Sequence, residues 1–239
     1  MLIRFDLITE GARESHVEID VTEATIAGWA GRDRAKMEEH ILELEALGVK
    51  RPEQTPTFYP VSAARLSRAS VITCLGEHSS GEAEVVFLGG DQDEVFVGIG
   101  SDHTDRHIEA YDVAVSKQVC DKPVGGKLWR LRDVVDHWDA LILSSDIEQD
   151  GTWTNYQEGT VGDLLAPGDL FNKYDGGTRL PTGTAMFGGT LPAKGGVRAS
   201  RRFRARLTDP VLDRSLELLY NIESLPWRAP QPDSVQSTQ

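Results

Sequence analysis

Two glutamates, Glu82 and Glu84, stand two positions apart at the start of an apolar run, Ala83 to Leu88. On a β-strand, residues at this spacing project from the same face, about 7 Å apart. Two carboxylates at that distance repel each other unless water screens them or a cation lies between them. A hard divalent cation would use both as oxygen ligands, whereas a solvated strand face would need no cation at all. The spacing alone leaves both interpretations open.

A dense polar segment, residues 102–109, follows the next apolar run and carries three acids, two histidines and one arginine. In this segment Asp102 could supply a third oxygen ligand, and Arg106 could bind a substrate carboxylate in bidentate fashion. His103 and His107, four positions apart, are also compatible with a zinc site on a helix, or with a capping or core role. The alternative for the whole segment is an ordinary helix N-terminus capped by Ser101 or Asp102.

Lys117 lies 15 residues after Asp102. A lysine beside a metal site can polarise a carbonyl group or stabilise an oxyanion. A single lysine without such a context is usually a surface residue, so its role depends on what surrounds it.

Taken in order, these motifs resemble those of the fumarylacetoacetate hydrolase superfamily. That superfamily carries an E-x-E pair, a D-x-(T/S)-x-R segment, a lysine, a Q-x-G-x-T element and a T-G-T turn. The chain also resembles a bacterial branch of the superfamily that has no assigned function. The matching residues, between about 70 and 192, are Glu82 and Glu84, then Asp102, Thr104 and Arg106, then Lys117, Gln157 to Thr160 and Thr182 to Thr184.

The resemblance implies an α+β, β-rich fold, namely a mixed β-sandwich roll with a small N-terminal α/β appendage, assembled as a homodimer. It implies a divalent cation held by Glu82, Glu84 and Asp102, with Mg2+ expected and Mn2+ or Ca2+ as alternatives. The catalytic residues implied are Lys117, Arg106 and His103, and Arg106 either orients the metal ligands or binds substrate. The substrate-binding residues implied are Glu109, Gln157 and Thr184.

The activity implied is hydrolysis of a C–C bond in a diketo or acylpyruvate-like oxo acid through a metal-stabilised enolate. Decarboxylation, isomerisation or hydration through the same enolate is the alternative within the superfamily. A non-catalytic metabolite-binding protein is the alternative from another class.

Several positions depart from the superfamily pattern. His107 replaces the aspartate after the arginine, Glu109 replaces a glutamine, and Ala185 replaces the proline after T-G-T. The water-activating Glu/His pair of the superfamily has no clear match. The candidates are His16 with Glu14 or Glu18, and His40 with Glu43.

Strands and one clear helix must position these side chains. Alternation or continuous apolar character predicts strands over residues 2–8, 17–21, 71–75, 83–88 and 95–99. Spacing predicts a helix over about residues 32–47, ended by Gly48. Further helices are expected over 106–115 and 128–137. Residues 212–222 fit a strand or a helix. We expect an N-terminal appendage (1–60), a main domain (61–225) and a disordered tail (226–239).

Composition excludes several classes of protein. The 239 residues carry 25 basic and 38 acidic side chains, a net charge of −13, which argues against nucleic-acid binding and against adhesion to an anionic membrane. Two cysteines, Cys74 and Cys120, are too few for a disulfide scaffold or a multi-cysteine zinc motif. The N-terminus lacks a signal-peptide pattern, so we expect a cytoplasmic protein whose partner is a small oxo acid.

Overall fold

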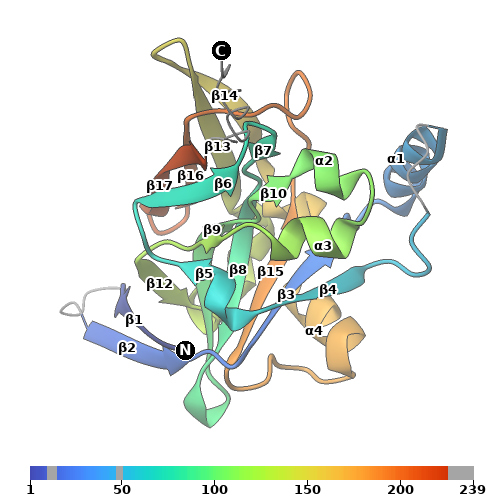
Figure 1. Cartoon of the computed structure of the whole chain (residues 1–239). Coiled ribbons are helices and arrows are strands. Elements are labelled where there is room, and N and C mark those ends of the chain that lie inside the picture. The colour runs from blue at the N-terminus through green and yellow to red at the C-terminus, as the bar shows by residue number, and fades with distance from the viewer. Residues whose placement is uncertain (10–14, 47–50, 226–239) are drawn as a thin grey trace, which may run out of the picture.

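The computed structural model describes residues 1–9, 15–46 and 51–225 of the chain. Two large sheets form most of the molecule (Figure 1). The eight-stranded sheet has the order β2-β1-β12-β9-β8-β15-β3-β4, and the five-stranded sheet has the order β14-β13-β16-β17-β6. Two short pairs, β10-β7 and β11-β5, lie beside them. The strands are β1 (Leu2–Leu7), β2 (Ser15–Asp20), β3 (Glu23–Gly28), β4 (Thr57–Val61), β5 (Leu66–Ser67), β6 (Val71–Leu75), β7 (Ser79–Ser80), β8 (Ala83–Gly89), β9 (Val95–Ser101), β10 (Thr104–Asp105), β11 (Lys122–Pro123), β12 (Lys127–Arg130), β13 (Ile142–Gln149), β14 (Thr152–Thr160), β15 (Thr184–Thr190), β16 (Arg202–Asp209) and β17 (Arg214–Leu225).

The central strands β8 and β9 are buried on both faces along their whole length. Val85 and Phe87 belong to a core shared with the five-stranded sheet, whereas Val86 and Leu88 belong to a second core inside the curled large sheet. This double burial explains why the two strands are continuous apolar runs rather than alternating ones. The polar residues at the ends of β8 and β9 therefore lie in the interior of the protein.

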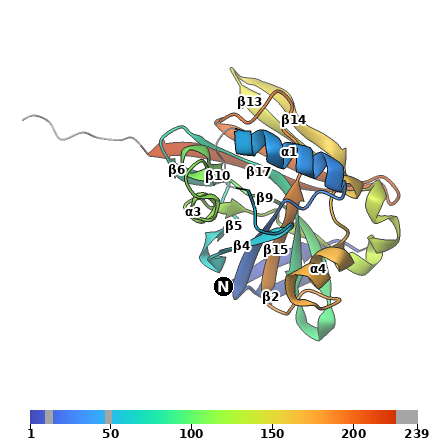
Figure 2. The ribbon, with the colours of Figure 1, turned by 90° about the vertical axis from the view of Figure 1, so that its right-hand side faces the viewer.

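The described residues form four α-helices around the sheets, and α1 is on the outside of the molecule (Figure 2). Asp33 begins α1 by accepting hydrogen bonds from the backbone N–H groups of Ala35 and Lys36. The helix expected over 32–47 is therefore present, although Leu47 and Gly48 lie outside the described residues. The α-helices are α1 (Arg34–Ala46), α2 (Arg106–Glu109), α3 (Val113–Gln118) and α4 (Pro167–Asp175).

The helix expected over 106–115 is two short helices instead of one. Asp105 caps α2 and Asp112 caps α3, each through its side chain. An acid that accepts backbone N–H bonds starts a new helix more readily than it continues an old one. The interruption lets α3 fold back beside α2, which brings Lys117 toward the end of β9.

The helix expected over 128–137 is wrong. Lys127–Arg130 forms strand β12, and two 3-10 segments, Leu131–Asp133 and Val135–Ala140, follow it. Trp129 is fully buried and pairs with Val97 of β9, so a place in the sheet decided the conformation of these residues. Residues 214–225 form the strand β17, which settles the choice that periodicity left open at 212–222.

The strand-rich fold class is confirmed. The boundary near residue 60 stays a prediction, but the residues on its two sides share one sheet, since β1 pairs with β12 and β3 pairs with β15. The expected tail, 226–239, lies outside the described residues. None of the described helices is long and apolar enough to cross a bilayer.

Candidate metal centre

The ends of β8 and β9 bring the three predicted carboxylates together. Glu82 directly precedes β8, Glu84 is its second residue, and Asp102 directly follows β9. The backbone N–H of Asp102 donates to the Glu82 carbonyl at 3.0 Å, which holds the two ends side by side. One ligand atom from each of the three carboxylates lies within 4.8 Å of the others. The acids therefore converge instead of pointing into solvent.

Two lysines contact the carboxylate of Asp102, one at each oxygen. Lys117 Nζ donates to Asp102 Oδ2 and lies 4.0 Å from Glu82 Oε2. Lys122 Nζ forms an ion pair with Asp102 Oδ1 at 3.2 Å. Burial alone would raise the pKa of the Asp102 carboxyl, but the two ammonium groups outweigh it and lower that pKa to about 2. Asp102 is therefore ionised at neutral pH.

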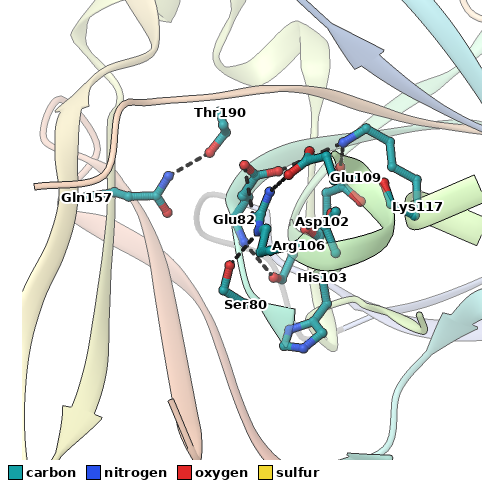
Figure 3. A network of polar contacts seen from close by, with 12 residues as sticks. Ser80, Glu82, Asp102, His103, Arg106, Glu109, Lys117, Gln157 and Thr190 are labelled. Atoms are coloured by element: carbon teal, nitrogen blue, oxygen red, sulfur yellow. Dashed lines mark hydrogen bonds and ion pairs between the residues drawn. The ribbon is translucent and has the colours of Figure 1, made fainter. Parts of the chain in front are cut away.

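Arg106 contacts three protein groups, two through hydrogen bonds and one through an ion pair. Its Nε donates to Ser80 Oγ at 2.7 Å, its Nη1 to Glu109 Oε2 at 2.7 Å, and its Nη2 pairs with Glu82 Oε1 at 3.2 Å (Figure 3). Burial lowers the pKa of the guanidinium, but Glu82 and Glu109 outweigh burial and raise it. The geometry supports the ligand-orienting role of Arg106 over direct binding of a substrate carboxylate. Glu109 lies at the edge of the cluster as its partner.

Glu84 is a buried acid whose ionised form is disfavoured by its surroundings. It is 2% exposed, and its Oε2 accepts a hydrogen bond from the backbone N–H of Gly189 at 2.7 Å. Burial, followed by the charge of Asp102, raises the pKa of the Glu84 carboxyl well above its usual range. A cation between the carboxylates would relieve this repulsion. The three hard oxygen donors therefore fit a divalent cation such as Mg2+.

Gln157 is a buried side chain that supports strand β8. Its Oε1 accepts from the Ala83 backbone N–H at 2.9 Å and from Ser145 Oγ at 2.8 Å. Its Nε2 donates to Thr190 Oγ1 at 2.8 Å and to the Leu191 carbonyl at 2.6 Å. These contacts use the polar atoms of the side chain, which is 1% exposed. Gln157 therefore fixes the residue between the two glutamates instead of presenting an amide to a ligand.

The structure does not bring two of the expected site residues to the carboxylates. The His103 ring lies on the other side of the segment, where its Nδ1 contacts Tyr220 Oη at 2.9 Å (Figure 3). Successive residues of an extended segment point to opposite faces, so Asp102 and His103 separate. Thr184 lies at the far end of β15, because Ala185 pairs with Leu88 whereas Thr190 pairs with Glu84. That separation is roughly 15 Å along the sheet.

Sequence reasoning missed Lys122, Gly189 and Thr190. Lys122 is fully buried, but nothing in its sequence context distinguishes it from a surface lysine. Gly189 has φ +98°, and a Cβ there would lie 2.8 Å from the Cβ of Ala30. The Gly188-Gly189 pair after a buried run was the signal available for this bulge in β15.

The candidates for a water-activating pair lie elsewhere or cannot be placed. His16 on β2 contacts Asp6 at 2.8 Å, on an edge strand three strands away from β9. Glu14 and the side chains of His40 and Glu43 lie outside the described residues. In the described part of the chain, the candidate centre thus has three carboxylates and three cationic side chains but no identified base.

Comparison with known proteins shows which family and which solved structures this chain resembles. Residues 27–220 match the model of a family described as "protein of unknown function (DUF2848)". No curated protein matches the sequence. The structure resembles 2-keto-3-deoxy-D-arabinonate dehydratase complexed with magnesium and 2,5-dioxopentanoate, with a TM-score of 0.61 and 14% identity over 87% of this chain and 74% of that one.

Two further solved structures share the fold. A yeast protein of the fumarylacetoacetate hydrolase family has a TM-score of 0.61 and 13% identity, covering 87% of this chain and 96% of its own. The 4-oxalocrotonate decarboxylase from Pseudomonas putida G7, complexed with calcium and acetate, has a TM-score of 0.53 and 18% identity, covering 84% and 77%. The resemblance to the fumarylacetoacetate hydrolase superfamily is thereby confirmed at the level of the fold.

Proposed function

The chain belongs to the DUF2848 family of proteins of unknown function, and we propose that it is a divalent-cation-dependent enzyme acting on small oxo acids. The observation that carries the proposal is the convergence of Glu82, Glu84 and Asp102 beside Lys117. Two of the structurally similar proteins are an oxo-acid dehydratase bound to magnesium and a decarboxylase bound to calcium. Their names support the substrate class that we propose here.

The charge balance of the centre suits a dication together with a monoanionic substrate. Four carboxylates, those of the three ligands and of Glu109, face three cationic side chains, Lys117, Lys122 and Arg106. With all four carboxylates ionised, as in the cation-bound state, these groups leave one negative charge, and a dication reverses the sign. A bound oxo-acid monoanion then brings the total to zero, which is the arrangement that a buried site favours.

The residues around the reacting carbonyl group have different roles. A bound cation would polarise the 2-oxo group and stabilise the negative charge that develops on its oxygen. The Lys117 ammonium, held on the cluster by Asp102, stabilises the same oxyanion. Burial lowers the pKa of Lys117, but Asp102 and Glu82 outweigh burial and raise it, so the lysine stays charged and acts as an electrostatic group instead of a base. Arg106 keeps Glu82 oriented.

The specific reaction that we propose is hydrolysis of a C–C bond in a diketo or acylpyruvate-like acid. Water adds to the distal carbonyl, the bond to the methylene carbon breaks, and the pyruvate part leaves as its enolate. Decarboxylation, isomerisation or hydration through the same enolate is the second candidate. It is favoured by one observation, namely that the described residues offer no identified base for the water that hydrolysis requires.

The test is a turnover screen in which Glu84→Gln is the variant and Glu158→Gln is the matched control. Glu158 is exposed on β14, on the opposite face of the strand from Gln157. The metal-free protein is mixed with Mg2+ or Mn2+ and an acylpyruvate, and loss of the enol absorbance is followed. Oxaloacetate-type and other 2-oxo acids are assayed in parallel for release of CO2 or loss of the oxo group.

Turnover that needs the cation and disappears only in Glu84→Gln supports the proposal. Turnover of the acylpyruvate identifies the hydrolase, and CO2 release or loss of the oxo group identifies the second candidate. Saturable oxo-acid binding without turnover assigns the protein to the non-catalytic class instead. A wild-type protein that binds neither Mg2+ nor Mn2+ at millimolar concentration overturns the metal centre.

A further inference from the structure

The two cysteines of the chain lie together in its core. Cys74 and Cys120 are 46 positions apart in the sequence, and both are free thiols with exposed fractions of only 5% and 3%. Both belong to the core shared by the two large sheets, and the Cys120 thiol donates a hydrogen bond to the Cys74 sulfur. The reaction proposed for the carboxylate centre uses neither residue. The fold therefore brings together two nucleophilic groups that have no role in that centre.

Strand β6 and the segment between α3 and β11 position the two thiols. Exposed and buried residues alternate along β6, so Ile72 and Cys74 face the core, and β6 is the edge strand of the five-stranded sheet. Cys120 lies between α3 and β11. Its carbonyl oxygen and that of His103 both accept hydrogen bonds from Lys122 Nζ, at 3.3 Å and 2.6 Å. One buried ammonium group thus holds the backbone of Cys120 beside that of His103.

The surroundings of the pair make the two thiols unequal. The hydrogen bond from Cys120 lowers the pKa of the Cys74 thiol, burial opposes this effect, and the neighbouring side chains of His103 and Ser79 add to it. The same contact, together with burial, raises the pKa of the Cys120 thiol. The thiolate is the reactive form of cysteine. Cys74 is therefore the thiol that reacts first, and Cys120 lies in contact with it.

We propose that Cys74 and Cys120 form a modification site, at which hydrogen peroxide produces a disulfide bond between them inside the folded protein. The Cys74 thiolate attacks one oxygen of the peroxide and the O–O bond breaks, which leaves a sulfenic acid and, after protonation, one water. The Cys120 sulfur then attacks Cys74 Sγ and displaces its hydroxyl group as a second water. The two thiols lose two electrons and two protons in total, and the peroxide is reduced to two waters. Neither step needs a cation or an oxo acid, so the inference is independent of the proposed metal-dependent function.

The disulfide would link the edge strand β6 to the segment that connects α3 with β11. It closes a loop between residues 46 positions apart, which restricts the unfolded chain. Because the thiols are already in contact, the folded chain needs little rearrangement to form the bond. We therefore expect oxidation to raise Tm by about 5–15 °C, and reduction by dithiothreitol to reverse the change.

The test exposes the reduced, folded wild-type protein to hydrogen peroxide without denaturant. Free thiols are then counted with Ellman's reagent after unfolding, and mass spectrometry of a non-reduced digest identifies the linked peptides. We expect the count to fall from two thiols per chain to none, with one linked pair of peptides that contains Cys74 and Cys120. A non-reducing gel should show a monomer. Peptide mapping and reversal by dithiothreitol separate this product from oxidised methionine.

The two serine variants test the order of the steps. Cys120→Ser keeps the reactive thiol but removes its partner, so peroxide should leave a sulfenic acid on Cys74 that dimedone traps. Cys74→Ser removes the thiol that starts the reaction, so Cys120 should stay free under the same conditions. Circular dichroism checks that each variant folds. If a variant does not fold, the thiol count and the linked peptides of the wild-type protein decide the question alone.

Three results would overturn the inference, and each leaves the metal-dependent function intact. The first is a folded wild-type protein that keeps both thiols free in peroxide. The second is a product in which the cysteines carry only separate oxygen adducts or link two chains. The third is an internal disulfide that lowers Tm, because the fold would then have to distort to form it.

Discussion

Replacing Gln157 by leucine tests whether this side chain supports the metal-binding strand or binds substrate. Leucine has nearly the same volume but cannot form any of the four hydrogen bonds of Gln157. The hydroxyls of Ser145 and Thr190 can rotate toward other partners. The backbone N–H of Ala83 and the carbonyl of Leu191 cannot, and each loses the hydrogen bond that the amide supplied.

The expected loss of stability follows from those two backbone groups. A buried polar group left unsatisfied costs about 1–3 kcal/mol, so the two together cost about 4 kcal/mol in the middle of that range. For a domain of this size, about 1 kcal/mol lowers Tm by about 2–4 °C, so Gln157→Leu should lower Tm by about 8–16 °C. Differential scanning calorimetry and the urea midpoint measure the change. Affinity for Mn2+ should fall as well, because Ala83 lies between two ligands.

The control for this experiment is Thr154→Ala, a substitution at an exposed position of the same strand. It should change the free energy of unfolding by less than about 0.5 kcal/mol. A Gln157→Leu protein whose Tm falls by less than about 2 °C, with KM raised and kcat unchanged, would refute the supporting role. That result would return Gln157 to the substrate-binding role that the sequence motif implied.

Three further predictions concern the charged groups. Because burial and Asp102 raise the pKa of Glu84, this carboxyl should give up a proton when a cation binds. Mn2+ affinity should therefore fall as pH decreases through the raised pKa, and calorimetry in buffers of different ionisation enthalpy counts the released proton. Lys117→Met removes the ammonium that contacts Asp102 and lies 4.0 Å from Glu82. Without this competing charge, Mn2+ and Ca2+ should both bind about tenfold more tightly or better, while turnover is lost. Weaker binding of both ions would contradict this placement of Lys117. Asp209 is fully buried between Arg214 and His137, and its pKa is lowered because hydrogen bonds from Leu212, His137 and Arg214 outweigh burial. The ionised Asp209 should therefore stabilise the fold above about pH 4, and this contribution should be lost as pH falls through the lowered pKa. Asp209→Asn should make the free energy of unfolding depend less on pH on the acid side. An unchanged pH dependence would contradict this role of Asp209.

The strands that carry the ligands could be predicted from the sequence because their burial is extreme. The runs at 83–88 and 95–99 are apolar without interruption, a pattern typical of strands covered on both faces. The run at 128–137 contains Leu128 and Trp129 with polar residues between apolar ones, which suits a helix equally well by periodicity. Pairing with β9 decided the outcome there, and a pairing between Trp129 and Val97, which are 32 positions apart, leaves no trace in local spacing.

The roles of single residues were likewise in part predictable from the sequence and in part decided by the tertiary structure. Glu82, Glu84, Asp102 and Lys117 could be grouped as one centre because two short motifs and one spacing carry them. His103 belongs to the same dense segment, but the alternation of side chains along an extended chain turned it toward Tyr220. A sequence motif implied that Thr184 belongs to the site. The register between β15 and β8 instead places Thr190 opposite Glu84.

By itself, the sequence determined the chemical nature of this protein: an acidic, cysteine-poor chain with a pair of glutamates beside one apolar strand and an aspartate after the next. The tertiary structure decided which groups contact each carboxylate. These groups include a backbone N–H 105 residues from Glu84 and the Nζ of Lys122, twenty residues after Asp102. Hydrogen bonds and ion pairs act over a few ångströms in space, so the groups that control the centre are set by how β8, β15 and β11 pack and not by their order along the chain.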